Sequence, residues 1–240
     1  KICTMIHLSV NINKIATIRN ARGGNLPDVT QFAIDCQRYG ADGITVHPRP
    51  DERHITLKDV YSISEHIHTE FNIEGYPDER YMKIIKEIKP HQATLVPDPP
   101  NVLTSDNGWN VEKEMDRLKG IIDQLHENGT RVSIFVNADE KSINDAVKTG
   151  TDRIELYTGP FASEFTKDPE SAIQNYSKAA LIAGQCGLLV NAGHDLNLDN
   201  LNFFKENVKP LAEVSIGHAL ISDALYFGIE NTIKRYKNCL

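Results

Sequence analysis

The stretch "VEKEMDRLKGIIDQLHENGTRVSIFV" (residues 111–136) contains the signals of a helix, a turn and a strand in direct succession. Its first part places apolar residues at intervals of three and four, which is typical of an amphipathic helix. Gly129 stands where a helix commonly ends with a residue in the left-handed conformation. The run "RVSIFV" (131–136) that follows is short and rich in β-branched residues, which favours a buried strand. The stretch therefore predicts one helix–glycine–strand unit.

The same unit recurs along the whole chain. Helical patterns such as "DVTQFAIDCQRYG" and "DERYMKIIKEIK" lead into short apolar runs, and several end in glycine. The runs are mostly continuous rather than alternating, as expected when both faces of a parallel sheet are covered. Eight strands alternating with helices predict an α/β protein with a single (β/α)8 TIM barrel over residues 1–240. The eight predicted strands are "HLSVNI" (7–12), "GITVHP" (43–48), "FNIEGY" (71–76), "QATLVP" (92–97), "RVSIFV" (131–136), "RIELYT" (153–158), "LLVNAG" (188–193) and "EVSIGH" (213–218).

An open, doubly wound sheet is the alternative architecture for such a pattern. That fold usually carries a glycine-rich phosphate turn, G-x-G-x-x-G, after its first strand. The corresponding segment here, "NINKIATIRNARGGN" (11–25), does not match it. The closed barrel is therefore the preferred interpretation.

Composition limits the classes of function. The chain has 240 residues, 40% of them hydrophobic and 25% charged, and a net charge of −7. These values are typical of a globular protein with a large core, and the acidic balance argues against nucleic-acid binding. No apolar run reaches the ~18 residues of a membrane span. The cysteines form no CxxC pair, so neither a zinc cluster nor a redox motif is indicated, and we expect a cytoplasmic protein with reduced thiols.

Polar residues gather where the predicted strands end. The carboxyl ends of all strands of such a barrel open on one face, and that face carries the active site. At least five separate strands deliver a polar or titratable group there, which predicts a catalytic mouth. The residues concerned are Asn11, Asn13, Lys14, His47, Arg49, Glu74, Glu155, Asn191, Gly193, His194, Gly217 and His218.

Two of these strand ends predict binding of phosphate. The segment "VHPRPDERHI" (46–55) places Arg49, Arg53 and His54 in one loop of an acidic protein, and arginine suits phosphate oxygens. The alternative is a solvated loop whose arginines pair with its own acidic residues, Asp51 and Glu52. A second anion site is indicated by "SIGHALISDAL" (215–225), where a strand passes through glycine into a helix.

Other polar residues carry weaker signals. His66 and His68 are two residues apart on a predicted helix, so they point to nearly opposite sides. They are interpreted as surface residues, as are His91 and His126. The loop "DPPNVLTSDNGWN" (98–110) is too long for a typical strand–helix connection and is predicted to be a lid. Its tryptophan is interpreted equally as a packing anchor or as part of that lid.

Several blocks of sequence resemble the pyridoxine 5′-phosphate synthase family of vitamin B6 synthesis. The resemblance runs in order from about residue 6 to 230. It implies a (β/α)8 barrel, generally octameric, that condenses 1-deoxy-D-xylulose 5-phosphate with 3-amino-2-oxopropyl phosphate. The products are pyridoxine 5′-phosphate, phosphate and water, and no metal or organic cofactor is used. The blocks are "VNINKIATIRNARG", "GADGITVHPRPDERHI", "NIE", "LVP" followed by Thr104, "IELYTG", "VNAGH" and "IGHALI".

The resemblance also implies roles for individual residues. It makes His47 and Glu74 proton acceptors, His194 the proton donor, and Glu155 the group that stabilises charge in the transition state. The aminoketone phosphate would be held by Asn11, Arg22, Gly217 and His218. The deoxyxylulose phosphate would be held by Arg49, His54 and Thr104. Histidine and a desolvated glutamate suit the several proton transfers of such a ring closure.

The chain departs from the family pattern at three predicted substrate contacts. Where the family often reads Asn-x-Asp-His, this chain has Asn11-Ile12-Asn13-Lys14, so an acid–base role of the Asp-His pair does not carry over. Lys14 can still donate to a substrate oxygen. Asp195 stands where the family commonly has glycine; its backbone N–H remains available, but its carboxylate must turn away from a phosphate dianion.

Two other functions remain open at this point. A metal-dependent hydrolase on the same barrel would use His47, His194, His218 and Glu155 as ligands, although the first strand lacks the closely spaced histidines that such enzymes often have. Metal analysis of the purified protein decides this. A barrel that binds phosphorylated ligands without catalysis is the other alternative, and a phosphate-release assay separates it from an enzyme.

Overall fold

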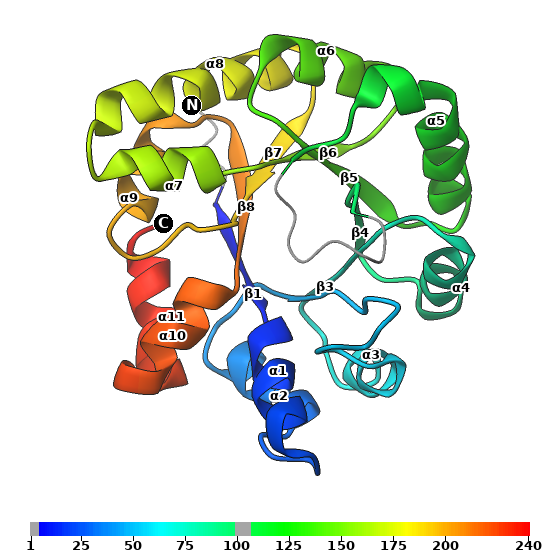
Figure 1. Ribbon diagram of the computed structural model, residues 1–240, viewed down its shortest axis with the longest axis vertical. Helices are drawn as coiled ribbons and strands as arrows, with labels where there is room; N and C mark the ends of the chain where they lie inside the picture. Colours follow the sequence, from blue (N-terminus) through cyan, green and yellow to red (C-terminus); the bar gives the residue numbers. More distant parts are fainter. Residues whose placement is uncertain (1–4, 99–106) are drawn as a thin grey trace.

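The computed structural model describes residues 5–98 and 107–240. Eight parallel strands form a closed barrel in which each strand pairs with the next and β8 pairs with β1, inside a ring of helices (Figure 1). The predicted (β/α)8 barrel is confirmed. The strands are β1 (His7–Asn11), β2 (Gly43–Val46), β3 (Glu70–Gly75), β4 (Gln92–Leu95), β5 (Arg131–Val136), β6 (Arg153–Leu156), β7 (Leu189–Ala192) and β8 (Leu211–Ile216).

Two helices instead of one follow each of the strands β1, β6 and β8. The long helix predicted at the start of the quoted stretch is α5, and it is followed by Gly129 with φ of 80°, as expected for a glycine that ends a helix. The helices are α1 (Asn13–Arg22), α2 (Val29–Arg38), α3 (Leu57–Ser64), α4 (Glu79–Ile88), α5 (Val111–Glu127), α6 (Glu140–Lys148), α7 (Gly159–Phe165), α8 (Pro169–Gln185), α9 (Leu201–Asn207), α10 (His218–Phe227) and α11 (Ile229–Asn238).

The two faces of the strands differ in chemistry. Residues such as Leu8, Val10 and Ile44 are fully buried and belong to the hydrophobic core cluster. The alternate positions are polar, and they face the barrel interior because side chains in a strand alternate between faces. Both faces are covered, as predicted, but the expectation of continuous apolar strands is wrong for the inner face.

Hydrogen bonds between neighbouring strands make this polar interior stable. Ser9 and Thr45 share a hydrogen bond of 2.7 Å, Asn72 donates to Thr45 at 3.3 Å, and Thr94 donates to Asn72 at 3.0 Å. These contacts link β1, β2, β3 and β4 in sequence. Buried polar groups cost little free energy when they bind each other in this way.

Charged residues occupy the interior toward the amino ends of the strands. Arg131 makes two hydrogen bonds to Glu70, at 2.9 and 2.8 Å. Arg153 donates to Glu213 at 3.1 Å and to Asn191 at 3.3 Å. Each of these charged groups thus has a partner of opposite sign, as charges withdrawn from water require. This layer forms the floor beneath the carboxyl-end mouth.

No helix in the described part of the chain has both the length and the apolar character needed to span a membrane.

Candidate active site

Hydrogen bonds join the ends of β1, β2 and β3 into one group. Asn13, the first residue of α1, accepts the backbone N–H of His47 at 2.9 Å and donates its own backbone N–H to Asn11 at 3.1 Å. The side-chain amide of Asn11 donates to Glu74 at 3.3 Å. Asn13 therefore holds the backbone that carries His47, and Asn11 holds the carboxyl group of Glu74.

His47 and Glu74 lie at the centre of this group. Their side chains are only 11% and 13% exposed, and 4.0 Å separates Nδ1 of His47 from Oε2 of Glu74. Burial lowers the pKa of His47 to about 3, and the charge of Arg49 adds to this effect. Burial raises the pKa of Glu74 to about 8, assisted by Glu213. At neutral pH both groups are therefore uncharged, although their separation would suit an ion pair.

Glu155 and His194 lie across the mouth from this pair. Glu155 is 5% exposed, and burial, together with the nearby carboxyl groups of Glu74 and Glu213, raises its pKa well above the usual range. His194 follows β7 and meets the edge of the Tyr157 ring at 5.7 Å between ring centroids. The Thr158 hydroxyl donates to the His194 carbonyl, which fixes the backbone of this residue.

Asp195 favours the protonated form of His194. Its Oδ2 lies 2.8 Å from Nδ1 of His194, and this hydrogen bond raises the pKa of the imidazole. The same contact lowers the pKa of Asp195. Asp195 has φ of 64°, in the left-handed region that favours glycine, so the glycine expected here from the resemblance would suit this backbone. The departure from glycine thus provides a carboxylate that favours the protonated form of His194.

The turn after β8 approaches the end of β1 closely. A Cβ atom on Gly217 would lie 3.2 Å from side-chain atoms of Asn11, so glycine allows this approach. His218 is the first residue of α10, and its charge helps to lower the pKa of Asp195. Gly217 and His218 therefore lie at the predicted mouth, where the first backbone N–H groups of α10 are without partners within the helix.

The loop after β2, residues 47–54, is called the cationic loop below. Arg49 is 5% exposed and lines a pocket with His47, Gly75, Tyr81 and Asp98. Burial, with the neighbouring charge of Arg53, lowers the pKa of Arg49. Burial and a neighbouring cation both destabilise the charged form of an arginine, and a bound anion would offset this destabilisation.

His54, at the end of the cationic loop, lies close to His47. Its ring lies 6.2 Å from that of His47, measured between centroids. Burial lowers its pKa to about 4, and the charges of Arg49 and Lys14 contribute. Lys14 is thus electrostatically part of the same positive region, as expected for a predicted substrate contact.

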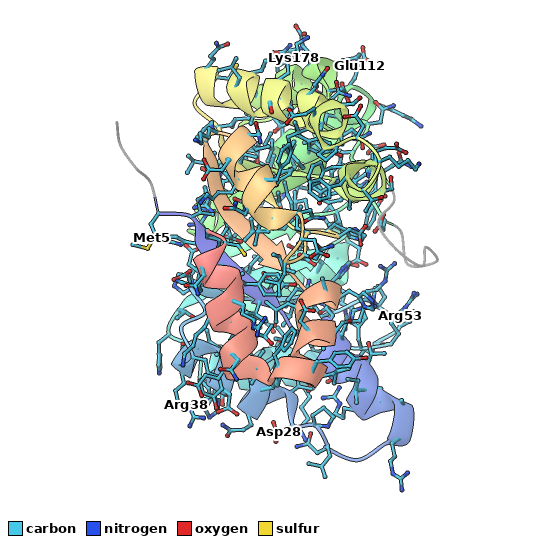
Figure 2. All side chains as sticks on the ribbon, turned by 90° about the vertical axis from the view of Figure 1, so that its left-hand side faces the viewer. Met5, Asp28, Arg38, Arg53, Glu112 and Lys178 are labelled. Atoms are coloured by element: carbon cyan, nitrogen blue, oxygen red, sulfur yellow. The ribbon has the colours of Figure 1, made fainter. Side chains whose placement is uncertain are left out.

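Arg53 fits the alternative interpretation of this loop. It pairs with Asp51 at 2.5 Å, and Glu52 pairs with Arg80 at 3.0 Å. Arg53 projects from the edge of the molecule, opposite to the side on which Met5 precedes β1 (Figure 2). The ion pairs expected of a solvated loop are therefore present for Arg53, whereas Arg49 is turned inward.

Two predicted substrate contacts are not placed at the mouth. Arg22 is exposed and ends α1, about 14 Å along the helix axis from Asn13. Thr104 lies outside the residues that the structure describes, as does most of the loop predicted to be a lid. Trp109 at the end of that loop is 5% exposed, donates to the Leu95 carbonyl at 2.9 Å and stacks on Tyr76. Trp109 is therefore a packing anchor.

The remaining histidines are not part of the site. His66, His68, His91 and His126 are exposed, as predicted. His126 pairs with Asp152 at 2.8 Å. Within residues 5–98 and 107–240, no group of three or more His, Cys, Asp or Glu side chains is arranged to hold a metal ion.

Glu213 and Arg153 were not predicted from the sequence. Glu213 is 2% exposed, burial raises its pKa to about 7, and its charge acts on both Glu74 and Glu155. Its signal was present in the sequence, because Glu213, Ser215 and Gly217 alternate with apolar residues along the predicted strand 213–218. Such a period of two indicates a polar inner face.

Comparisons with known proteins show which proteins this chain resembles over its length. The family model described as "Pyridoxal phosphate biosynthesis protein PdxJ" matches residues 8–240. The pyridoxine 5′-phosphate synthase of Porphyromonas gingivalis is 58% identical over 236 residues, which cover 98% of this chain and 99% of that protein. The corresponding protein of Bacteroides fragilis is 55% identical, with 98% of this chain and 100% of that protein covered.

Similarity to solved structures is weaker in sequence and supports the fold alone. The crystal structure of phosphoribosyl anthranilate isomerase from Thermotoga maritima matches with a TM-score of 0.60 at 15% sequence identity. The match covers 97% of this chain and 97% of that one.

Proposed function

The chain belongs to the family of the pyridoxal phosphate biosynthesis protein PdxJ, and we propose that it catalyses the synthesis of pyridoxine 5′-phosphate. The proposed reaction condenses 1-deoxy-D-xylulose 5-phosphate with 3-amino-2-oxopropyl phosphate and releases phosphate and water. The observation that carries the proposal is the buried, uncharged pair His47 and Glu74 at the junction of a cationic loop and a group of buried carboxyls.

The buried carboxyls favour a substrate that carries an amine. Glu74, Glu155 and Glu213 are called the carboxyl wall below. In addition to the effect of burial, Glu213 raises the pKa of Glu74, and Glu74 and Glu213 both raise the pKa of Glu155. An ammonium group entering this region would favour their ionised forms, since an opposite charge within a few ångströms lowers the pKa of an acid. We place the amine of the aminoketone there, with Asn11 beside it. Its phosphate would bind at Gly217 and His218, where α10 begins.

The cationic loop favours the phosphate of the second substrate. Arg49, His54 and Lys14 would provide the donors, and they lie close together because the charges of Arg49 and Lys14 both lower the pKa of His54. Thr104 stays in the proposal through the family resemblance. Arg22 is also included because of the family resemblance, although its position at the end of α1 lies away from the mouth formed by its own chain.

The protonation states support the proposed division of roles. A neutral imidazole accepts protons, so His47 suits the base. The Asp195 carboxylate raises the pKa of His194 and so favours its protonated form, which suits the donor. Glu74 holds a proton at neutral pH and becomes an acceptor once a cationic substrate has lowered its pKa. Glu155 would stabilise positive charge that develops on the substrate nitrogen.

The proposed enzyme needs no metal or organic cofactor for these steps. By resemblance to the family we also propose a cytoplasmic homo-oligomer, an octamer, whose barrel over residues 1–240 is one catalytic domain.

The decisive experiment supplies the purified protein with both substrates. We expect release of inorganic phosphate together with formation of pyridoxine 5′-phosphate, which is followed by its fluorescence and identified by mass. Neither product should appear when one substrate is omitted, and prior treatment with a chelator should leave the rate unchanged. Binding of both substrates without product would indicate a non-catalytic barrel and contradict the proposal. Activity that depends on a stoichiometric metal would contradict the cofactor-free mechanism.

A further inference from the structure

Two residues near the end of α1 hold the backbone of the cationic loop. The side-chain nitrogen of Asn20 lies 2.9 Å from the carbonyl oxygen of His54 and 3.2 Å from that of Arg53. Arg19 also donates to the His54 carbonyl, at 3.2 Å. The carbonyl of His54 therefore accepts two hydrogen bonds from one helix that is more than 30 residues away in sequence.

A buried ion pair fixes the direction of these donors. Arg19 is 6% exposed and binds Asp59 through both terminal nitrogens, at 2.5 and 2.8 Å. Its remaining donor, Nε, binds Oδ1 of Asn20 at 3.0 Å. Because Nε can only donate, the amide oxygen of Asn20 must face Arg19 and the amide NH2 must face the loop. Asp59 is also part of the capping box of α3, so the unit connects α1, the loop and α3.

The conformation of the loop requires such support. Glu52 has φ of 48°, which is uncommon for a residue with a side chain and persists where the surroundings enforce it. Its carboxylate accepts the Leu57 N–H at 2.9 Å and a donor of Arg80 at 3.0 Å. Arg80 supports the loop from the α4 side, and Arg19 and Asn20 support it from the α1 side.

The backbone carbonyl of His54, which Arg19 and Asn20 bind, belongs to the peptide unit that orients the His54 ring. The carbonyl of His54 and the N–H of Ile55 lie in one rigid plane and point in opposite directions when the peptide is trans. That N–H donates to Nδ1 of His54 at 2.9 Å. Nδ1 is therefore without a proton, and the neutral ring carries its proton on Nε2. Fixing the carbonyl thus fixes the tautomer of the ring.

We propose that Arg19 and Asn20 are positioning residues that hold the His54 ring in its Nε2–H tautomer, ready to donate a hydrogen bond to a substrate phosphate. The role of the ring as a phosphate donor rests on the proposed function. The tautomer and its dependence on Asn20 do not rest on the proposed function. The tautomer and the binding of phosphate are therefore tested separately.

The first test measures the tautomer by NMR on protein labelled with ¹⁵N-histidine, at a pH above the titration of the free imidazole. His54→Gln identifies the His54 signals. Asn20→Asp keeps the oxygen that accepts from Arg19 and removes the NH2 donor, whereas Asn20→Ala removes both. Asn128→Ala is the matched control, because Asn128 also donates its side-chain N–H to a backbone carbonyl, that of Ile85 at 3.0 Å, beside the amino end of β5.

We expect a single Nε2–H tautomer in the wild-type protein and in Asn128→Ala, and a mixture of tautomers in both Asn20 variants. A single unchanged tautomer in both Asn20 variants would overturn the proposal. The second test measures binding of deoxyxylulose phosphate and steady-state kinetics. The Asn20 variants should bind this substrate about tenfold more weakly and raise its KM, with kcat and the KM of the aminoketone phosphate little changed.

The outcomes separate this proposal from the proposed function. If the wild-type protein does not bind deoxyxylulose phosphate, the proposed function fails, while the NMR experiment still decides the positioning role. In that case a shift of the His54 Nε2 signal on addition of inorganic phosphate, lost in Asn20→Asp, supports it. Equal weakening of both substrates by the Asn20 variants would show a general structural effect and contradict it.

Discussion

The two sides of the mouth respond to burial in opposite ways. On the cationic loop, burial lowers the pKa values of His47 and His54 to about 3 and about 4. On the carboxyl wall, burial raises the pKa of Glu74 to about 8 and that of Glu213 to about 7. Both sides are thereby driven toward their neutral forms in the absence of ligand. Each side would therefore gain from a ligand of opposite charge, which supports the proposal of a phosphate on one side and an amine on the other.

The largest expected effect comes from removing the pair at which the two sides meet. His47→Asn and Glu74→Gln preserve size and remove the proton-transfer groups. Each should lower kcat by about 10²–10⁴-fold, as is usual for loss of a general acid or base. Steady-state kinetics with both substrates measures this effect.

The control for this experiment is His66→Asn, which changes an exposed histidine on the outside of the barrel. It should retain wild-type turnover. Circular dichroism should show an intact fold for all three variants. Near-normal turnover in both His47→Asn and Glu74→Gln would contradict their assignment as proton acceptors.

The next largest effect concerns the cationic loop alone. Arg49→Lys keeps the charge but loses the planar fork of donors that matches a phosphate. It should weaken binding of deoxyxylulose phosphate by roughly 1–3 kcal/mol and leave the aminoketone phosphate nearly unaffected. Isothermal calorimetry with each substrate measures the difference.

Arg53→Lys is the matched control in the same loop, since Arg53 is engaged with Asp51. Its effect should be much smaller. Equal weakening of both substrates by Arg49→Lys would show that Arg49 supports the site in general and does not discriminate between its two sides.

The same two sides differ in how far the sequence predicts them. The cationic loop can be predicted from the sequence because its residues, 47–54, are contiguous and follow a recognisable strand. The carboxyl wall draws one residue from each of β3, β6 and β8, and each carboxyl is separated from the next by more than 50 residues. Glu74 and Glu155 were predicted from their positions on the third and sixth strands, and the resemblance added their roles, whereas Glu213 was not predicted.

The fold was predictable from local signals because helix periodicity, glycine at helix ends and β-branched runs all agreed. The polar inner face was not predicted, since the short strands were interpreted as continuously apolar. Distances between side chains, such as the 4.0 Å between His47 and Glu74, depend on how the barrel closes. Burial, which sets the pKa values, likewise depends on that closure.

A third prediction concerns stability and isolates the carboxyl wall. The pKa of Glu74 rises from 4.5 to about 8 on folding, so between these values the folded state retains a proton that the unfolded state has lost. The free energy of unfolding must then fall as pH rises through this window. His47, with its pKa lowered to about 3, acts in the opposite direction only below its unfolded value of 6.5. The contribution of Glu74 is therefore unopposed by His47 between pH 6.5 and 8.

Glu74→Gln should flatten the fall in stability over this window. It should raise the free energy of unfolding at pH 8, relative to wild type, by on the order of 1–3 kcal/mol. Urea denaturation at pH 6.5, 7.2 and 8 measures this, with Glu127→Gln on the exposed face of α5 as control. An unchanged slope in Glu74→Gln would mean that Glu74 is ionised at neutral pH in the folded protein.

The smallest effect is expected at Asp195, where solvent screens the charges. The side chains of His194 and Asp195 are 37% and 48% exposed, so their interaction is weaker than one between buried groups. Asp195→Asn keeps an oxygen that accepts from His194 and tolerates the left-handed backbone, but it removes the negative charge. The pKa of His194 should therefore fall toward its ordinary value, because the hydrogen bond to the Asp195 carboxylate is what raises it.

Since the proposed donor acts in its protonated form, activity should be lost at a lower pH in this variant than in the wild-type protein. NMR titration of His194 and the alkaline limb of the kcat profile should shift together, while Asp199→Asn, which changes an exposed carboxylate in the same loop, should move neither. A shift of the titration without a shift of the alkaline limb would remove His194 from the role of proton donor and leave Asp195 with a structural role only.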